Sequence, residues 1–386
     1  MDVAPTVPAA TRWPAAERDA MARALDAAAT VRCATSPNPW VGCVVLAADG
    51  TVAGAGATAP PGGPHAEVVA LREAGARAAG STVVTTLEPC AHVGRTPPCT
   101  DALIEAGVAR VVVGILDPDP QVAGRGVAVL AASGVDVAVG LGAEQVESQL
   151  AAYLKHRRVG RPWVVLKLAG TLDGRIAAPD GSSAWLTGPD ARADAHRLRA
   201  ESDAIVVGAG TVRCDDPQLT VRAPDGRATV QRQPLRVVLG EVPARARVRP
   251  ALSLGGDLGD VLDELGRREI LQVLVEGGAR VAHAFHRAGL VDRYVVYLAP
   301  ALFGGDDAVP MFAGPGAPRV DDLWRGRLVD VRRVGQDLRV ELAPPGAGDR
   351  FGTGVPHADV LVGDCEAAPA EDLPDLDRSD HDLDPR

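Results

Sequence analysis

Four residues among the first hundred of the chain have the types and the order needed for metal-assisted hydrolysis. His65 and Glu67 form a His-x-Glu motif, and Cys90 and Cys99, each preceded by a proline, follow it. One imidazole and two thiolates suit Zn²⁺ and leave a fourth position for water, whose pKa then falls to near neutrality. Glu67 cannot easily reach the same ion, but it can move a proton from that water to a departing amine. The pattern predicts a zinc-dependent deaminase.

The spacing of the two cysteines points to a particular class of deaminase. Zinc nucleobase deaminases usually have two residues between them, whereas eight lie between them here. The segment L-E-P-C-A-H-V-G-R-T-P-P-C over 87–99, with P-N-P-W-V-G-C over 37–43 and D-P-D-P-Q-V-A-G-R-G over 117–126, resembles the bifunctional riboflavin-biosynthesis deaminase/reductase family. The resemblance implies deamination of a diamino-ribosylamino-pyrimidinone phosphate, followed by reduction of its ribose to a ribityl chain with NADPH.

Three further residues of the first half are candidate substrate contacts. Asn38 lies in a Pro-Asn-Pro turn, and the resemblance favours a substrate contact over a plain turn residue. His92 could contact substrate or be a structural or exposed histidine. Arg95 could hold the substrate phosphate, because a guanidinium pairs with such oxygens through two hydrogen bonds. The other cysteines are interpreted as core or incidental thiols: Cys33, Cys43, Cys214 and Cys365.

A second kind of chemistry is indicated near residue 277. Residues 270–280 read as a strand that runs into Gly277 and Gly278 and then into a helix. Bare glycines at a helix start let backbone N–H groups approach a phosphate closely. The third glycine of the Rossmann fingerprint is missing after Gly210, and a Gly-Gly pair can equally reflect flexibility at a helix start.

Four motifs extend the resemblance to the reductase half of the same family, whose fold is similar to dihydrofolate reductase. They are K-L-A-G-T-L-D-G-R over 167–175, S-A-W-L-T over 183–187, G-T-V-R-C-D-D-P over 210–217 and V-E-G-G over 275–278. The resemblance implies an NADP site lined by Ala169, Trp185, Thr211, Asp215, Gly278, Ala279, Arg280, Val281, Ala282, His283 and Ala284. It implies ribose-phosphate contacts from Ser183, Arg199, Leu219, Arg222 and Glu276.

Lys167 is one of only two lysines in a chain that otherwise uses arginine, the other being Lys155. A lysine kept inside a motif suggests a need for a compact ammonium group. We expect Lys167, Asp215 and Glu276 to activate the open-chain sugar imine for hydride attack. A purely structural ion pair is the alternative.

Two positions depart from the family pattern. Many relatives have a histidine seven residues before the ligand histidine, where this chain has Thr58. Gly240 and Glu241 stand where relatives usually have Asp and Ser or Thr. We expect one phosphate or ribose contact and one contact at the cofactor's edge to differ from the family.

The elements that must position these residues can be read from periodicity and turn signals. Apolar spacing and cap residues predict helices over 17–30, 66–78, 99–106 and 189–201. Apolar runs predict strands over 41–47, 51–55, 81–87, 110–116, 163–169 and 203–207. We therefore expect an α/β chain, and the resemblance implies that it has an N-terminal cytidine-deaminase-like domain and a C-terminal dihydrofolate-reductase-like domain.

Length, composition and charge set the domain organisation. The 386 residues fit two domains, and we place a flexible start at 1–16, the deaminase at 17–150, a linker at 151–162 and the reductase at 163–345. Residues 346–386 contain eleven acidic residues and three arginines, which leaves a charge of only −2 for the rest of the chain. We interpret them as a disordered acidic tail, with partner binding as the alternative.

The partners expected from composition are few. A nearly neutral folded part gives no support for nucleic-acid binding. The chain has no run of 18 apolar residues and no signal-peptide pattern at its start, so we expect a cytoplasmic protein without a membrane partner. The His65, Cys90 and Cys99 set predicts Zn²⁺, and the resemblance implies NADPH and a small pyrimidine ribose-phosphate substrate. We also expect a homo-oligomer, either a dimer or a tetramer.

Two other hypotheses compete with the bifunctional enzyme. The first is a zinc deaminase for another nucleobase with a degraded nucleotide-binding half, which NADPH turnover on the deaminated substrate would distinguish. The second is a non-catalytic protein in which a closed structural zinc site holds a dinucleotide sensor. An open coordination position and Glu67 speak against it.

Overall fold

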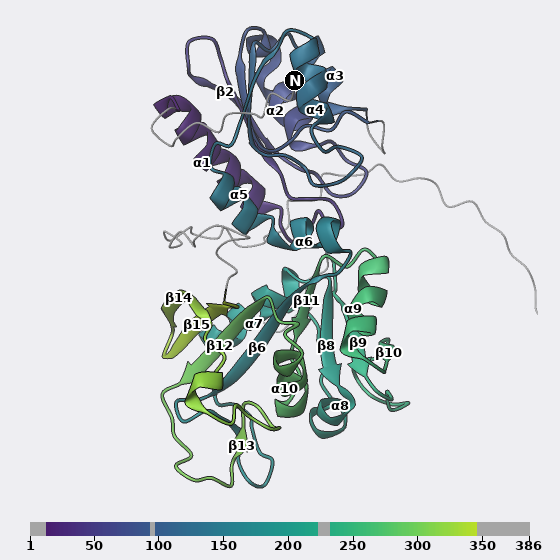
Figure 1. Ribbon diagram of the computed structural model, residues 1–386, viewed down its shortest axis with the longest axis vertical. Coiled ribbons are helices and arrows are strands. Elements are labelled where there is room, and N and C mark those ends of the chain that lie inside the picture. Colours follow the sequence, from purple (N-terminus) through teal and green to yellow (C-terminus); the bar gives the residue numbers. More distant parts are fainter. Residues whose placement is uncertain (1–12, 93–96, 223–231, 346–386) are drawn as a thin grey trace, which may run out of the picture.

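The computed structural model describes residues 13–92, 97–222 and 232–345 (Figure 1). The acidic segment 346–386, residues 1–12 and Arg95 lie outside the described residues, so what was predicted for them stays a prediction. No helix in the described ranges is both long and apolar enough to cross a membrane.

The first unit is a five-stranded mixed sheet in the order β2-β1-β3-β4-β5. The centre of the sheet is rich in valine and fully buried, which is typical of strands covered on both faces. Strand β1 is antiparallel to β2 and β3, whereas β3, β4 and β5 are parallel. The strands are β1 (Gly42–Leu46), β2 (Val52–Ala57), β3 (Thr82–Leu87), β4 (Arg110–Ile115) and β5 (Asp136–Val139). The helices are α1 (Ala15–Thr30), α2 (Ala66–Ala74), α3 (Cys99–Glu105), α4 (Arg125–Ala132) and α5 (Ala143–Gln149).

Glycines in β2 let helix α2 pack directly on the sheet. A Cβ atom on Gly54 would lie 2.3 Å from the carbonyl oxygen of Ala70, and one on Gly56 would lie 2.5 Å from that of Ala66. Any larger side chain would push the helix away from the strand. The predicted helix 66–78 ends its α-helical part at Ala74, and Gly75–Ala78 continues it as a 3₁₀ turn.

The second unit is an eight-stranded sheet in the order β10-β9-β8-β11-β6-β12-β15-β14. All neighbours from β10 to β12 are parallel, and β15 and β14 add antiparallel pairs. The strands of this sheet are β6 (Trp163–Thr171), β8 (Ala204–Gly208), β9 (Leu235–Leu239), β10 (Leu252–Leu254), β11 (Gln272–Val275), β12 (Arg293–Ala299), β14 (Arg327–Val334) and β15 (Asp337–Ala343). Strands β7 (Arg175–Ala177) and β13 (Val309–Pro310) form a separate pair, and Val320–Asp322 is a 3₁₀ turn.

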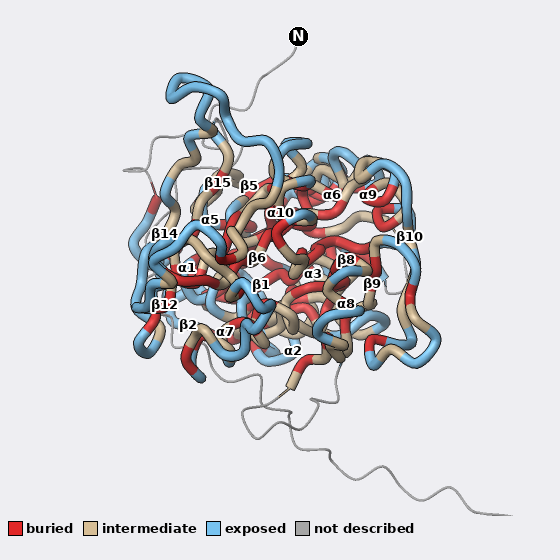
Figure 2. Tube along the Cα trace, turned by 90° about the horizontal axis from the view of Figure 1, so that it is seen from below, coloured by how far each residue is buried: buried red, intermediate tan, exposed pale blue. Residues whose placement is uncertain are grey.

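Helices cover this sheet and lead away from the carboxyl ends of its parallel strands. They are α7 (Pro189–Ala200), α8 (Ala209–Asp215), α9 (Leu258–Arg267) and α10 (Ala279–Arg287). Figure 2 shows that buried residues follow the inner strands such as β8, while exposed residues gather in the peripheral loops. The α/β class predicted from the sequence is confirmed in both units.

The segment 151–162, predicted to be a linker, contains a helix between the two units, α6 (Ala151–Val159) (Figure 1). Tyr153 and Leu154 are buried in the core of the first unit. Lys155 forms an ion pair with Asp292 of the second unit, and Nε2 of His156 lies 2.9 Å from the carbonyl oxygen of Gly266. The junction is therefore packed against both units. The domain boundaries assigned from the sequence stay a prediction.

Candidate active sites

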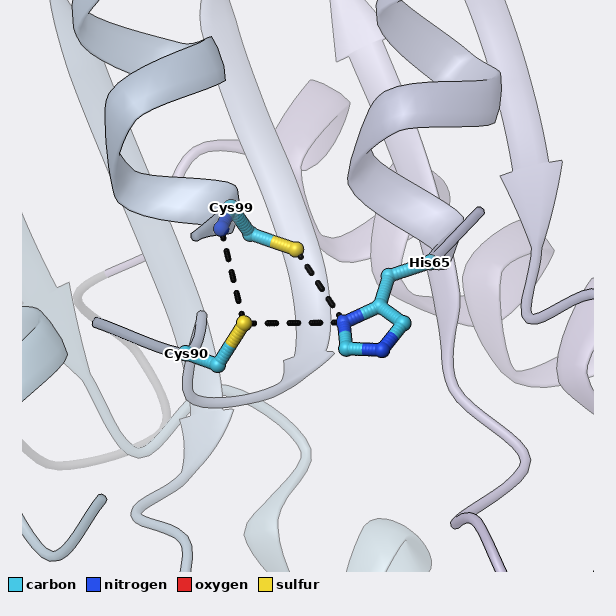
Figure 3. A group of neighbouring side chains, drawn as sticks. All are labelled: His65, Cys90 and Cys99. Atoms are coloured by element: carbon cyan, nitrogen blue, oxygen red, sulfur yellow. Dashed lines mark hydrogen bonds between the residues drawn. The ribbon is translucent and has the colours of Figure 1, made fainter. Parts of the chain in front are cut away.

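The three predicted zinc ligands come together from three segments of the first unit. His65 directly precedes α2, Cys99 is the first residue of α3, and Cys90 lies in the loop after β3. Nδ1 of His65 lies 3.6 Å from Sγ of Cys90 and 3.2 Å from Sγ of Cys99 (Figure 3). One donor atom from each residue lies within 4.8 Å of the others. The set fits a zinc ion bound through Nδ1 and two sulfurs.

The electrostatics of the two thiols also fit a bound cation. Hydrogen bonding with Cys99 lowers the pKa of Cys90 to about 4. The hydrogen bond with Cys90 and burial instead raise the pKa of Cys99. A single negative charge is thus favoured when no cation is present. A zinc ion would stabilise both thiolates, because its charge is the largest in such a site.

Glu67 lies in the first turn of α2, beside the ligand cluster but outside it. Its side chain is buried, and burial raises the pKa of its carboxyl group, which the charge of His65 opposes. A carboxyl group whose pKa is raised in this way holds a proton more readily, which suits a group that must both accept and donate one. The position fits the proton-transfer role predicted from the sequence.

The predicted substrate contacts of the first unit are less defined. Asn38 is half-buried, and its backbone N–H donates to the carbonyl of Thr35 at 2.9 Å. His92 is half-buried, and its Nδ1 has no hydrogen-bond partner among the described residues. Thr58, at the departure from the family, is buried, and its hydroxyl accepts from the N–H of Val41 at 3.1 Å. The Thr58 hydroxyl group therefore has a hydrogen-bond partner within the fold.

Glu88 is a residue to which the sequence pattern assigned no role. It is buried directly before Pro89 and Cys90, and its carboxylate accepts backbone hydrogen bonds from the segment 117–127. The available signal was a charged residue at the end of an apolar strand, because a buried carboxylate needs partners.

In the second unit, Lys167 lies on β6, and Glu276 directly follows the adjacent parallel strand β11. Leu166 of β6 pairs with Val275 of β11, so the residues that follow them are neighbours across the sheet. Nε and Nη2 of Arg199 donate to the two carboxylate oxygens of Glu276 at 2.7 and 2.8 Å. Burial opposes ionisation of Glu276, but Arg199 prevails and lowers its pKa to about 2.

Two opposing effects act on the pKa of Lys167. Burial lowers the pKa of its ammonium group, while the charge of Glu276 raises it. Its Nζ lies 5.9 Å from the ring centroid of Tyr297, within reach of a cation–π interaction. Asp215, the third predicted catalytic residue, ends α8 and is exposed. Within the described ranges no hydrogen bond or ion pair joins it to the other two, so its role stays a prediction.

The predicted cofactor residues lie at two helix starts. Helices α8 and α10 follow the neighbouring parallel strands β8 and β11, so both begin at the same edge of the sheet. The N–H of Gly278 donates to Oγ1 of Thr211 at 3.2 Å, which ties the two helix starts together. A Cβ atom on Gly277 would lie 2.5 Å from Cβ of Val281. Close packing therefore requires this glycine, and the paired helix starts suit a pyrophosphate.

The remaining predicted cofactor residues differ in exposure. Ala282 is buried in the core of the unit, so it can face a cofactor only through its backbone. Trp185 is 77% exposed, with the guanidinium of Arg192 4.8 Å from its ring centroid. Ala169 lies two residues after Lys167 on β6 and so on the same face. Ala279 is buried, Arg280 and Ala284 are exposed, and Val281 and His283 are half-buried.

The predicted ribose-phosphate contacts gather beside α7, with one exception. Arg199 also donates to the carbonyl of Thr220 at 3.2 Å, and the N–H of Arg222 donates to Nδ1 of His196 at 3.2 Å. Leu219, which lies between Arg199 and Arg222 in the sequence, is buried and adopts a φ of +51°. Ser183 is exposed and apart from these contacts. His196, three residues before Arg199 on the same helix, was not predicted.

Gly240, at the second departure from the family, adopts φ of +105° after β9. A Cβ atom at this position would lie 3.2 Å from Cβ of Ala209, the first residue of α8. Glycine therefore suits this turn beside the cofactor helix. Glu241 is exposed.

Two family models match the two units. Residues 14–115 match the "Cytidine and deoxycytidylate deaminase zinc-binding region", and residues 162–340 match the "RibD C-terminal domain". The riboflavin biosynthesis protein RibD of Mycobacterium tuberculosis is 45% identical over 84% of this chain and 96% of its own length.

Solved structures of whole chains agree with this match. RibD of Acinetobacter baumannii is 38% identical, with a TM-score of 0.81, over 85% of this chain and 99% of that chain. A Thermotoga maritima diaminohydroxyphosphoribosylaminopyrimidine deaminase/5-amino-6-(5-phosphoribosylamino)uracil reductase is 32% identical, with a TM-score of 0.76, over the same shares. With both sites in place, this chain belongs to the RibD family of bifunctional riboflavin-biosynthesis enzymes, in which a zinc-dependent deaminase is joined to an NADPH-dependent reductase.

Proposed function

We propose that the first unit deaminates diaminohydroxyphosphoribosylaminopyrimidine and that the second reduces the ribosyl group of 5-amino-6-(5-phosphoribosylamino)uracil to ribityl. The Thermotoga maritima relative is a deaminase and reductase of these two compounds, which supports both substrates. The observation that carries the proposal is the joint presence, in one chain, of the His65, Cys90 and Cys99 cluster and of the half-buried Lys167 beside the Arg199–Glu276 pair.

In the deaminase site, the two cysteines and His65 would hold the zinc ion. When bound, zinc makes a water molecule nucleophilic at neutral pH. Glu67 then has the proton-transfer role: its carboxylate takes one proton from the attacking water and delivers it to the ring nitrogen. It then takes a second proton from the added hydroxyl group and delivers it to the departing amine. Its burial next to the ligands keeps bulk water from competing for that proton.

In the reductase site, NADPH supplies the hydride, and the paired starts of α8 and α10 would hold its phosphates. Arg199 fixes the Glu276 carboxylate through two hydrogen bonds, and the charge of Glu276 opposes the lowering of the Lys167 pKa that burial causes. Lys167 then polarises the nitrogen of the open-chain sugar imine for hydride attack. Arg222 would contact the ribose phosphate.

The closed structural zinc site considered as an alternative has less support. In the described part of the chain, three side chains converge on the candidate metal position, and Glu67 stands beside them as a separate carboxylate. Three ligands and a free acid are typical of catalytic zinc, whereas structural sites have four ligands.

We also propose that the chain forms a homo-oligomer through the β14 edge of the large sheet. Strand β14 lies at one edge of the sheet, and its residues Leu328 and Val331 are 56% and 50% exposed. An open edge with exposed apolar residues favours pairing with a second copy. Light scattering on the purified chain, compared with the Val331→Lys variant, tests this assignment. The cytoplasmic location stays a prediction.

Mass analysis of the products tests the two activities directly. Without NADPH, the zinc-loaded chain should convert the pyrimidinone phosphate into the uracil with release of ammonia. With NADPH, the product should gain two further hydrogens as the ribose becomes ribityl. Ammonia release without any reduced product would remove the reductase assignment, and an unchanged substrate would remove the deaminase assignment.

A further inference from the structure

Glu88 connects the cysteine loop of the deaminase site to a distant segment of the chain. One carboxylate oxygen accepts from the N–H groups of Asp117 at 3.1 Å and Gly124 at 2.9 Å. The other accepts from Gly126 at 2.9 Å and Val127 at 3.2 Å. The carboxylate is almost fully buried, so these four bonds replace its hydration.

The same carboxylate caps helix α4 from outside the helix. Gly126 and Val127 are the second and third residues of α4, whose N–H groups have no partner within the helix. No side chain of the helix's own cap residue, Gly124, can supply an acceptor. A negative charge is also favoured at a helix start. Glu88 therefore fixes the start of α4 against the end of β3.

The contact continues into the backbone of the ligand loop. A Cβ atom on Gly126 would lie 1.9 Å from the carbonyl oxygen of Pro89, so α4 and the loop touch directly at the residue before Cys90. Beyond this contact, Cys90 is held by two bonds from the start of α3: Thr100 N–H to its carbonyl at 3.2 Å and Cys99 N–H to its sulfur at 3.4 Å.

We propose that Glu88 is a positioning residue for Cys90, holding the ligand loop at the distance from His65 that zinc requires. The proposal rests on the zinc role assigned to Cys90. Residues that orient metal ligands without touching the metal typically change metal affinity about 10- to 100-fold when replaced. Because Glu88 acts through the position of a sulfur, its effect should appear in the metal site itself and not only in overall stability.

The test uses the full chain with Glu88→Gln, which keeps the shape but places an amide donor against two N–H donors. Zinc release to a chelator, measured well below the unfolding temperature, should be about 10- to 100-fold faster than in the wild type. The sulfur-to-metal absorption of the cobalt-substituted protein should shift. Deamination should lose kcat, while NADPH oxidation on the uracil substrate should be unchanged.

Asp337→Asn is a matched control in the other unit. Asp337 is fully buried, and its carboxylate accepts from the N–H of Gly188 at 2.7 Å. This variant should lower the melting temperature but leave zinc release and the cobalt spectrum as in the wild type. A folded Glu88→Gln protein with wild-type zinc release and cobalt spectrum would overturn the proposal.

A milder variant covers the case in which Glu88→Gln does not fold. Val127→Pro removes one of the four N–H groups that donate to Glu88, the one at 3.2 Å, in the first turn of a helix, where proline is tolerated. Zinc release should accelerate in the same direction but less, and wild-type release from this folded variant would contradict the proposal. A wild-type chain that binds no zinc would instead defeat the zinc assignment, which is a separate outcome.

Discussion

Glu67 is almost fully buried and Lys167 is half-buried, and burial shifts the pKa values of these two groups in opposite directions. Burial raises the pKa of Glu67 and so keeps a proton within reach of the reacting ring. In the reductase site, burial lowers the pKa of Lys167, while Glu276 and Arg199 form a charged pair beside it. Individual substitutions should therefore separate proton transfer from ligand binding in one site and sugar activation in the other.

Replacing Glu67 tests proton transfer. The Glu67→Ala protein should keep about one zinc ion per chain, because its three ligands remain. Deamination should fall by about 10²- to 10⁴-fold or more, since proton transfer by a positioned side chain is lost. Metal analysis and ammonia release check these two outcomes. Near-normal ammonia release, or loss of zinc from the folded variant, would exclude the role given to Glu67.

Replacing Lys167 tests sugar activation. Lys167→Ala should stop NADPH oxidation while ammonia release continues and the uracil intermediate accumulates. Lys155→Ala is the control, because it removes the other lysine and its ion pair with Asp292 at the junction. That variant should keep most NADPH oxidation. Normal oxidation by Lys167→Ala would remove Lys167 from the mechanism.

At the scale of elements, the segment after β4 links the deaminase unit to helix α6. The hydroxyl of Tyr153 on α6 donates to the carboxylate of Asp117 at 3.0 Å, and Arg157 pairs with Asp119 at 3.5 Å. The same segment supplies the four N–H groups bound by Glu88. The junction helix thus holds the loop that packs against the zinc ligands.

Asp117 gives this element a pH dependence. Burial raises its pKa to about 6, above the value of about 3.9 in an unfolded chain. The folded state therefore binds the proton more tightly, so this contribution to stability is fully present below about pH 4 and is lost as pH rises through about 6.

The Asp117→Asn variant should lack this contribution. Between about pH 5 and about pH 8, the free energy of unfolding of the wild type should fall relative to the variant by about 1 kcal/mol. Denaturant unfolding of both proteins at saturating zinc measures the difference. A difference that stays constant over this pH range would show that Asp117 does not titrate there.

For the whole molecule, the two chemistries occupy separate units. The described zinc-type cluster lies in the first unit, and the paired helix starts lie in the second. Ion pairs such as that of Arg32 with Glu201 and that of Lys155 with Asp292 join the units without entering either site. Loss of activity at one site should therefore leave the activity of the other site intact.

Metal removal tests this independence. Treatment with a chelator should abolish deamination and lower the melting temperature of the first unit, because a bound metal stabilises the fold that holds it. NADPH oxidation with the uracil substrate should persist in the same sample. Re-added zinc should restore deamination. Equal loss of both activities in a chain that remains folded would contradict the two-site assignment.

The sequence by itself determined the ligand set, the proton-transfer candidate and the family. Those features are local: a ligand type, a helix start or an eight-residue gap is read from neighbouring positions. The β3 strand before Cys90 and the α10 helix after Gly278 followed from apolar runs and glycines in the same way. Local patterns also indicated the α/β class, because strands and helices alternate along the chain.

Only the tertiary structure decided the long-range partners. The hydrogen bonds that Glu88 accepts join residues 29 to 39 positions apart in the sequence. Those that Arg199 donates to Glu276 join residues 77 positions apart. Sheet register and helix packing set such pairs, and neither can be read from spacing along the chain. The same holds for α6, whose polar sequence suggested a linker, although five of its nine residues are buried and it contacts both units. The residue types that carry the chemistry could be predicted from neighbouring positions in the sequence. The contacts that hold those residues in place come from positions that only folding brings together.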